Sequence, residues 1–264
     1  MIRSGLPAPG LVPVALALAV ALLAGCATSS KDAEMSGTFE GPPVAIGQGQ
    51  AWTFVTLDEQ GKAQTLGIRL SEEALSGLPA DVPPSGAWEY DLQLPAEAAA
   101  LGYDHVTLDW NPHGHIPEGV YDSPHFDFHF YAIDHSARDE ITLDAASLER
   151  ARKAPETDYM PEGYALPPGT EVPKMGAHAI DPSSSEFNGE PFTKTFIYGF
   201  YDGKVIFVEP MMTLDYLASR PDESIPVKQP AAYEKGFAYP TSYGIRFDKM
   251  GKRYEVTLEG LARR

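Results

Sequence analysis

The chain has 264 residues, of which 43% are hydrophobic and 11% aromatic, which is enough to fill the core of a globular domain. It carries 37 acidic against 20 basic residues, a formal net charge of −17. This acidity argues against binding to nucleic acid and against peripheral binding to anionic lipid, because both attract basic surfaces.

The N-terminus has the pattern of an export signal. Arg3 is followed by an apolar run, Leu11–Ala24, that ends in Leu-Ala-Gly-Cys. The run is too short to span a bilayer comfortably, and the small residues before Cys26 are typical of a cleavage site. Residues 1–25 are therefore predicted to be a lipoprotein signal peptide, with Cys26 as the lipidation site. The alternative is an ordinary signal peptide with an incidental cysteine.

Lipidation of Cys26 would have two consequences. Cys26 is the only cysteine, so a metal site would have to use His, Asp, Glu, carbonyl groups or Met. The acyl chains would anchor the protein to a membrane. Ala27, rather than Asp, follows the cysteine and favours the outer membrane, facing the periplasm. The oligomeric state stays open.

Residues 26–40 are small and polar after the cysteine and are predicted to be a flexible tether. Residues 41–264 are predicted to form a single β-rich domain. Turn residues, alternation and capping residues predict the following elements in chain order: strands at 51–57, 63–70 and 88–94, a helical turn after Pro95, strands at 105–110 and 125–133, a helix at 143–152, a proline-rich loop at 154–191, a hairpin at 195–208, a short helix at 213–219, and a last hairpin of 243–247 and 254–258.

Many short strands, 24 prolines and 24 glycines favour a mainly β fold. We expect an antiparallel β-sandwich or barrel, cupin-like or similar, with a few short helices. A parallel α/β fold is disfavoured because few helices reach ten residues.

Histidine is concentrated in one segment. Six of the seven histidines lie between His105 and His135, and His178 stands alone. Within PHFDFHFY, alternation sends three phenylalanines to one face and His125, Asp127 and His129 to the other. Same-face neighbours lie ~6.6 Å apart, whereas His125 and His129 lie ~13 Å apart on a regular strand. A His–Asp pair can therefore share an ion, and a His125–His129 pair cannot unless the backbone is irregular.

Ligands from elsewhere in the chain would complete a site. His178 and Glu209 are the remote candidates, and His113 and His115 form a secondary His-x-His pair in a Pro/Gly loop. A strand pair joined by a distant histidine and acid resembles the metal sites of cupins, and three histidines on aromatic-rich strands resemble those of carbonic anhydrases. The set predicts one divalent ion, zinc, manganese, iron or copper. The alternatives are a hydrogen-bonded structural cluster or scattered surface histidines.

Three segments carry a wider resemblance: DWNPHGHIPEGVYDSPHFDFHFY, MGAHAID and GFYDGKVIFVEPMMT. They resemble an uncharacterised bacterial domain of unknown function found in exported proteins and lipoproteins, over about residues 41–258. The resemblance implies a mainly β domain and supplies no catalytic residues.

Two functions stay open. The first is a lipid-anchored cell-envelope protein of unknown biochemical role that binds a divalent metal, a small-molecule ligand or a partner, or that has only a structural role. The second is a metal-dependent enzyme, cupin-like or hydrolytic, that acts on a small molecule in the periplasm. A closed set of four ligands would favour the binder, and an open coordination position in a cleft would favour the enzyme.

Overall fold

The computed structural model describes residues 1, 2, 5 and 36–263. The chain divides into the units Met1–Ala33 and Glu34–Arg264, and the fold below is that of the second unit. The predicted signal peptide and Cys26 lie outside the described residues. Among the residues that are described, no helix combines the length and the apolar character needed to cross a membrane.

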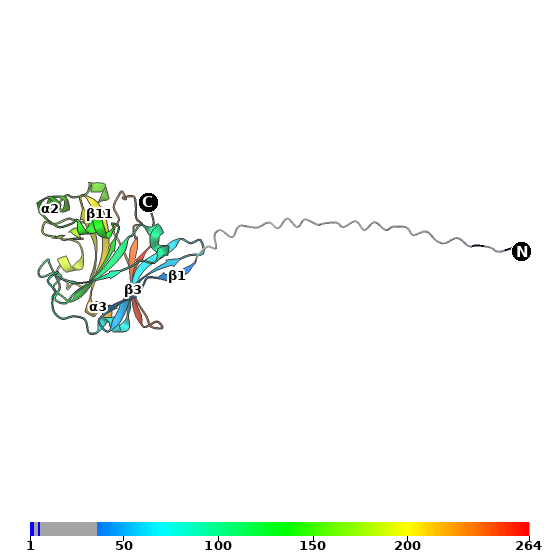
Figure 1. The fold of residues 1–264 in the computed structure, drawn as a ribbon. Helices are drawn as coiled ribbons and strands as arrows, with labels where there is room; N and C mark the ends of the chain where they lie inside the picture. Colours follow the sequence, from blue (N-terminus) through cyan, green and yellow to red (C-terminus); the bar gives the residue numbers. More distant parts are fainter. Residues whose placement is uncertain (3–4, 6–35, 264) are drawn as a thin grey trace. The chain divides into compact units, whose positions relative to one another are not determined.

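Two seven-stranded antiparallel sheets make up the described domain (Figure 1). Sheet 1 has the order β1-β3-β4-β14-β13-β12, with β2 also paired to β3. Its strands are β1 (Gly37–Glu40), β2 (Val44–Ile46), β3 (Gly49–Leu57), β4 (Ala63–Ser71), β12 (Asp222–Pro226), β13 (Ser242–Asp248) and β14 (Arg253–Glu259).

Sheet 2 has the order β5-β6-β7-β11-β10-β9-β8. Its strands are β5 (Trp88–Leu92), β6 (His105–Asn111), β7 (His125–Tyr131), β8 (Glu171–Val172), β9 (Gly176–Ala179), β10 (Lys194–Tyr201) and β11 (Lys204–Thr213). The expected mainly β, antiparallel fold is confirmed, and its two packed sheets make it sandwich-like.

The helices are short, as expected. They are α1 (His135–Asp139), α2 (Ala145–Ala151), α3 (Leu214–Ala218) and the 3-10 turns η1 (Glu72–Leu75), η2 (Ala96–Leu101), η3 (Thr157–Tyr159) and η4 (Ser185–Phe187). Asp144 begins α2 by accepting hydrogen bonds from the backbone N–H groups of Ala146 and Ser147.

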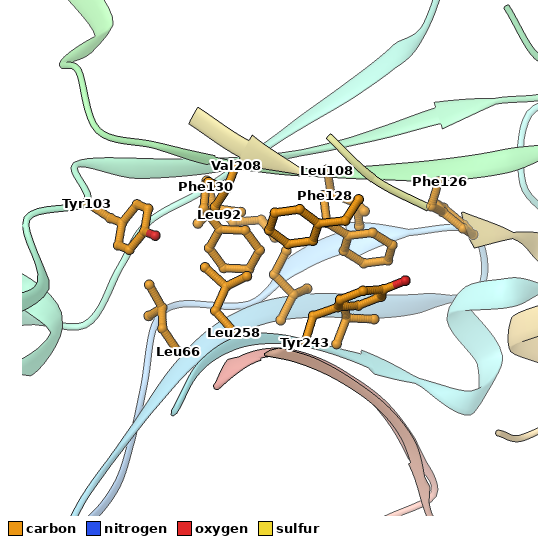
Figure 2. Close-up of a cluster of buried hydrophobic side chains, with 14 of the residues drawn as sticks. Leu66, Leu92, Tyr103, Leu108, Phe126, Phe128, Phe130, Val208, Tyr243 and Leu258 are labelled. Carbon is orange, nitrogen blue, oxygen red and sulfur yellow. The ribbon is translucent and has the colours of Figure 1, made fainter. Parts of the chain in front are cut away.

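The main core lies between the two sheets. Phe126, Phe128 and Phe130 of β7 are fully buried and face Leu66 and Leu258 of sheet 1 (Figure 2). The predicted alternation of β7 is therefore confirmed on its apolar side. Burial of such aromatic side chains is the main favourable contribution to folding.

Two expectations need correction. The predicted tether reaches too far, because Gly37–Glu40 pairs with β3 as strand β1. The segment 154–191 is not only loop, because it contains β8 and β9. Strand β9 is four residues long and consists of Gly, Ala and one histidine, so it has neither the length nor the alternation that predicts a strand. Its pairing with β10 defines it instead.

Candidate metal centre

The polar side chains of interest lie on the face of sheet 2 that points away from the main core. Antiparallel register sets Asp109 of β6 opposite Asp127 of β7, and Asp127 opposite Met211 of β11. Two residues further along β7, on the same face of the sheet, His129 lies opposite Thr107 of β6. The register thus gathers, in the middle of one sheet, polar residues that are far apart in sequence.

The first group, the His129 cluster, consists of His129, His178 and Glu209. One nitrogen from each imidazole and one carboxylate oxygen lie within 4.8 Å of one another. His129 Nε2 lies 3.5 Å from Glu209 Oε1, and His178 Nε2 lies 3.9 Å from Glu209 Oε2. His129 Nε2 and Glu209 Oε2 are buried and have no hydrogen-bond partner among the described residues.

The second group, the Asp127 cluster, consists of His115, His125 and Asp127. Its ligand atoms also lie within 4.8 Å of one another. His125 Nε2 lies 3.2 Å from Asp127 Oδ1, and His115 Nε2 lies 3.3 Å from Asp127 Oδ2. His115 comes from the loop between β6 and β7, in which it forms an isolated antiparallel bridge with Tyr121.

Backbone carbonyls fix the tautomer of three of the histidines. Nδ1 of His115 lies 2.7 Å from the Ile116 carbonyl, Nδ1 of His125 lies 2.7 Å from that of Ser123, and Nδ1 of His178 lies 2.8 Å from that of Thr170. A carbonyl oxygen only accepts, so Nδ1 carries the proton that is donated. The Nε2 lone pair of each neutral ring is therefore left to face a carboxylate.

Phe207 of β11 holds two of the imidazoles in place. Its ring packs edge-to-face against His129 at 5.0 Å and against His178 at 5.3 Å. The ring fits because Gly199 lies beneath it, where an added Cβ would come within 2.0 Å of a Phe207 ring carbon. Gly199 also pairs with His178 across β10 and β9, so one glycine allows both contacts.

The electrostatics of the His129 cluster keep its histidines neutral. Burial lowers the pKa of His129 to about 3 and that of His178 to about 4. Burial, followed by the charges of Asp127 and Asp109, raises the pKa of Glu209 well above its usual value. In metal-free protein the two imidazoles are therefore neutral, and Glu209 keeps its proton to a higher pH than an ordinary carboxyl, so this buried cluster carries little charge.

In the Asp127 cluster, the neighbouring histidines affect the carboxylate more than burial does. Burial alone would raise the pKa of Asp127, but the positive charge that His125 and His115 carry when they are protonated outweighs burial and holds that pKa well below the usual range. Asp127 Oδ2 also accepts a 2.7 Å hydrogen bond from Asn111 Nδ2. This carboxylate is therefore ionised and fixed in orientation.

A cavity of about 400 Å³ opens over both clusters. Its lining includes the polar groups His115, Asp127, His129, His178 and Glu209. Apolar side chains form much of the rest of the wall, and they include Ile116, Val172, Met175, Ile180, Phe187, Ile197 and Met211. The volume suits a small molecule.

The structure divides the predicted ligands between two groups. His125 and His129 belong to different clusters, in agreement with their predicted separation along β7. His115 joins His125 and Asp127, whereas His113 is exposed and belongs to neither cluster. Met211 lines the cavity and Met212 lies in the main core, so the adjacent methionines do face opposite ways.

Sequence reasoning missed Asp109. It is 1% exposed, it lines the cavity, and its Oδ2 lies 3.8 Å from His129 Nδ1. Burial, followed by the charge of Glu89, raises its pKa well above the usual value. The sequence did contain a signal for Asp109. In β6, Thr107, Asp109 and Asn111 alternate with apolar residues and therefore share one face, and the structure shows that this polar face is buried too.

A third group of possible ligands lies apart from the cavity. It contains Asp104, His105 and His135. The His105 ring stacks on His135 with 3.7 Å between ring centroids, and its Nδ1 lies 3.0 Å from Asp104 Oδ1. Asp104 and His135 are exposed, so water can compete with an ion for their ligand atoms, although His105 Nε2 is buried without a hydrogen-bond partner among the described residues.

Comparison with known proteins gives a partial family match. A model of the family described as TTHB210-like, hypothetical protein TTHB210, matches residues 58–110. Neither the curated proteins nor the solved structures give a match. The matched segment runs from the end of β3 into β6, so it includes Asp109 and stops before the histidines of both clusters. The wider resemblance to an exported domain of unknown function stays a prediction.

The lowered pKa of His178 predicts how metal-free protein responds to acid. Between pH 6.5 and about 4 the unfolded chain binds a proton at His178 that the folded chain does not, so folding stability falls as the pH falls. Relative to His178→Gln, wild-type protein should lose about 1.4 kcal/mol more of its free energy of unfolding per pH unit. Urea unfolding in EDTA between pH 6.5 and 5 measures this difference.

His113→Gln is the matched control, because His113 is exposed and belongs to neither cluster. Its stability should follow that of the wild type at each pH. Parallel curves for wild type and His178→Gln would show that His178 takes up its proton normally in the folded protein.

Proposed function

We propose that this protein binds a divalent metal ion through His129, His178 and Glu209. The observation that carries the proposal is a group of ligand atoms from three strands that lie within 4.8 Å of one another, of which the buried His129 Nε2 and Glu209 Oε2 have no hydrogen-bond partner among the described residues. Leaving such groups unsatisfied is costly, and a cation removes the cost.

The distances support an ion. Two ligands that each lie about 2.1 Å from a tetrahedral ion are about 3.4 Å apart. The His129–Glu209 pair is separated by 3.5 Å and the His178–Glu209 pair by 3.9 Å, so small side-chain movements would bring all three onto one ion. The hydrogen bond of His178 Nδ1 to the Thr170 carbonyl leaves Nε2 of the neutral ring without a proton, so His178 Nε2 cannot donate to Glu209.

The ligand set narrows the choice of metal. Two histidines and one carboxylate suit zinc, iron(II) or manganese. Behind His129, the carboxylate of Asp109 and the hydroxyl of Thr107 lie 3.8 and 3.4 Å from Nδ1. Partners of this kind orient a metal-binding imidazole and raise its basicity.

Three protein ligands leave coordination positions open toward the cavity. An ion held there would bind a small molecule through an oxygen or nitrogen atom, while the apolar wall would bind the rest of that molecule. This open arrangement favours the second candidate function, a metal-dependent enzyme. A bound ion would lower the pKa of a water molecule there or polarise a carbonyl.

The place of action follows from the N-terminal sequence. We propose that the protein is a lipoprotein anchored through Cys26, with the β domain in the periplasm at the outer membrane. The support is the Leu-Ala-Gly-Cys sequence after an apolar run and the alanine that follows the cysteine. The acidic net charge argues against nucleic acid as a partner.

Metal binding is tested directly by His178→Ala and Glu209→Gln. Each change removes a ligand, so affinity for zinc or cobalt at the His129 cluster should fall more than about 100-fold, since loss of an outer partner alone costs 10- to 100-fold. Elemental analysis and the visible spectrum of bound cobalt measure the ion. His113→Ala is the control and should bind like wild type. Unchanged affinity in both ligand variants would rule out this site.

The open cavity predicts that alkyl hydroxamates bind to the metal-loaded protein. The hydroxamate would bind the ion and the alkyl chain would lie on the apolar wall, so each added methylene should tighten binding about fourfold until the cavity is full. Isothermal titration of a series from acetyl to hexanoyl measures this. His178→Ala protein is the control and should bind no member well. Affinity that does not change with chain length would place the open position in bulk water.

Lipid anchoring predicts that Cys26 takes up labelled palmitate in a Gram-negative host. Cys26→Ser should abolish the label and release the protein from washed membranes, because the acyl chains supply the membrane affinity. Ser29→Ala, three residues further on, should keep both properties. Wild-type protein that is exported without label would instead show an ordinary signal peptide.

A further inference from the structure

The Asp127 cluster faces the same cavity with its own set of unsatisfied atoms. His125 Nε2 and Asp127 Oδ1 are buried and lie 3.2 Å apart, yet neither has a hydrogen-bond partner among the described residues. His115 Nε2 lies 3.3 Å from the other oxygen of Asp127, so the three side chains bring their ligand atoms within 4.8 Å of one another.

The hydrogen bonds around this cluster orient its ligand atoms. The carbonyls of Ile116 and Ser123 accept the Nδ1 protons of His115 and His125, which leaves both Nε2 atoms as bare acceptors. Asn111 donates to Asp127 Oδ2 and fixes the carboxylate. Each member of the group thus has an outer partner, an arrangement that is typical of metal ligands.

We propose that a second divalent ion binds to His115 Nε2, His125 Nε2 and the Asp127 carboxylate, separately from the ion at the His129 cluster. The three ligand atoms lie within 4.8 Å of one another. The site takes a hard or borderline cation such as zinc or manganese, for which two imidazoles and one carboxylate are suitable ligands.

The two ions would be neighbours that share no protein ligand. Asp127 and His129 are two residues apart on β7 and so ~6.6 Å apart along the strand. This exceeds the ~3.5–4 Å between metals in bridged two-metal centres. The cavity touches both sites through His115 and Asp127 on one side and His129, His178 and Glu209 on the other. One small molecule in the cavity could therefore contact both ions.

Protons are the competing explanation for the Asp127 cluster. Protonated His115 and His125 would form ion pairs with Asp127 and would need no metal. The two explanations differ in the number of ions bound per chain, which is why stoichiometry is the decisive quantity.

The test compares two histidines of one loop. His115 is half-buried over the cavity, and His113, two residues earlier, is exposed and belongs to neither cluster. Full-length protein is stripped with EDTA, reloaded with zinc and passed through a desalting column, and zinc per chain is measured by elemental analysis. The variants are His115→Ala, His113→Ala, His178→Ala and the double variant His115→Ala/His178→Ala.

We expect two zinc ions in wild type and in His113→Ala, one in His115→Ala, one in His178→Ala, and none in the double variant. Because His115 lies on a loop, its removal should leave the circular dichroism spectrum unchanged. His125→Gln, which keeps a polar side chain, should also bind one ion and serves as a second variant.

Other results overturn the proposal in distinguishable ways. One ion in wild type that is lost in His178→Ala and kept in His115→Ala would leave the proposed function intact and assign protons to the Asp127 cluster. A single ion in wild type that is lost both in His115→Ala and in His178→Ala would mean that the two clusters form one shared site. Two ions that both survive in His115→Ala would place the second ion elsewhere.

Discussion

The two-residue alternation of β7 is the constraint on which both the core and the site depend. It buries Phe126, Phe128 and Phe130 between the sheets, and the same backbone therefore turns His125, Asp127 and His129 to the opposite face. A slip of one residue in register would send the rings to the cavity and the imidazoles into the core, which makes that slip very costly. The hydrophobic effect that closes the sandwich thus also fixes which polar groups face the cavity.

The same alternation explains what could be predicted from the sequence. The faces of β7 and the separation of His125 from His129 follow from the 3.3 Å rise of a strand and hold in the structure. The position of His178 could not be predicted, because β9 is defined by its pairing with β10 and not by its own pattern. Nor could the sequence show that His115 folds back onto Asp127, since a Pro/Gly loop has no fixed direction. Sequence reasoning also treated the candidate ligands as one set, whereas the register of the sheet divides them between two clusters.

The surroundings of the two clusters show why the unsatisfied atoms are informative. Among the described residues, five of the eleven buried side-chain atoms without a hydrogen-bond partner belong to these clusters and the neighbouring Asp109. Outside this face, Arg69 pairs with Glu255, and Tyr103 donates to the Ala238 carbonyl. On the cavity face, the backbone carbonyls satisfy the Nδ1 atoms, and the Nε2 atoms and carboxylates are left opposite one another. A purely structural cluster would gain stability from a donor at these positions, such as the Asn111 amide that Asp127 already uses. The absence of such donors among the described groups favours a cation as the missing partner.

Placing the site on the outer face of sheet 2 also separates its chemistry from the stability of the fold. The main core between the sheets contains none of the six ligand residues, so it can form without an ion. Metal binding would still add to stability, because an ion that binds only the folded chain shifts the folding equilibrium by mass action. The contribution of the ion would act on the cavity face, where Phe207 packs against both His129 and His178. Loss of metal would therefore loosen the packing of these three rings before it affected the sandwich. We expect ligand variants to change the site while the fold of the sandwich stays the same.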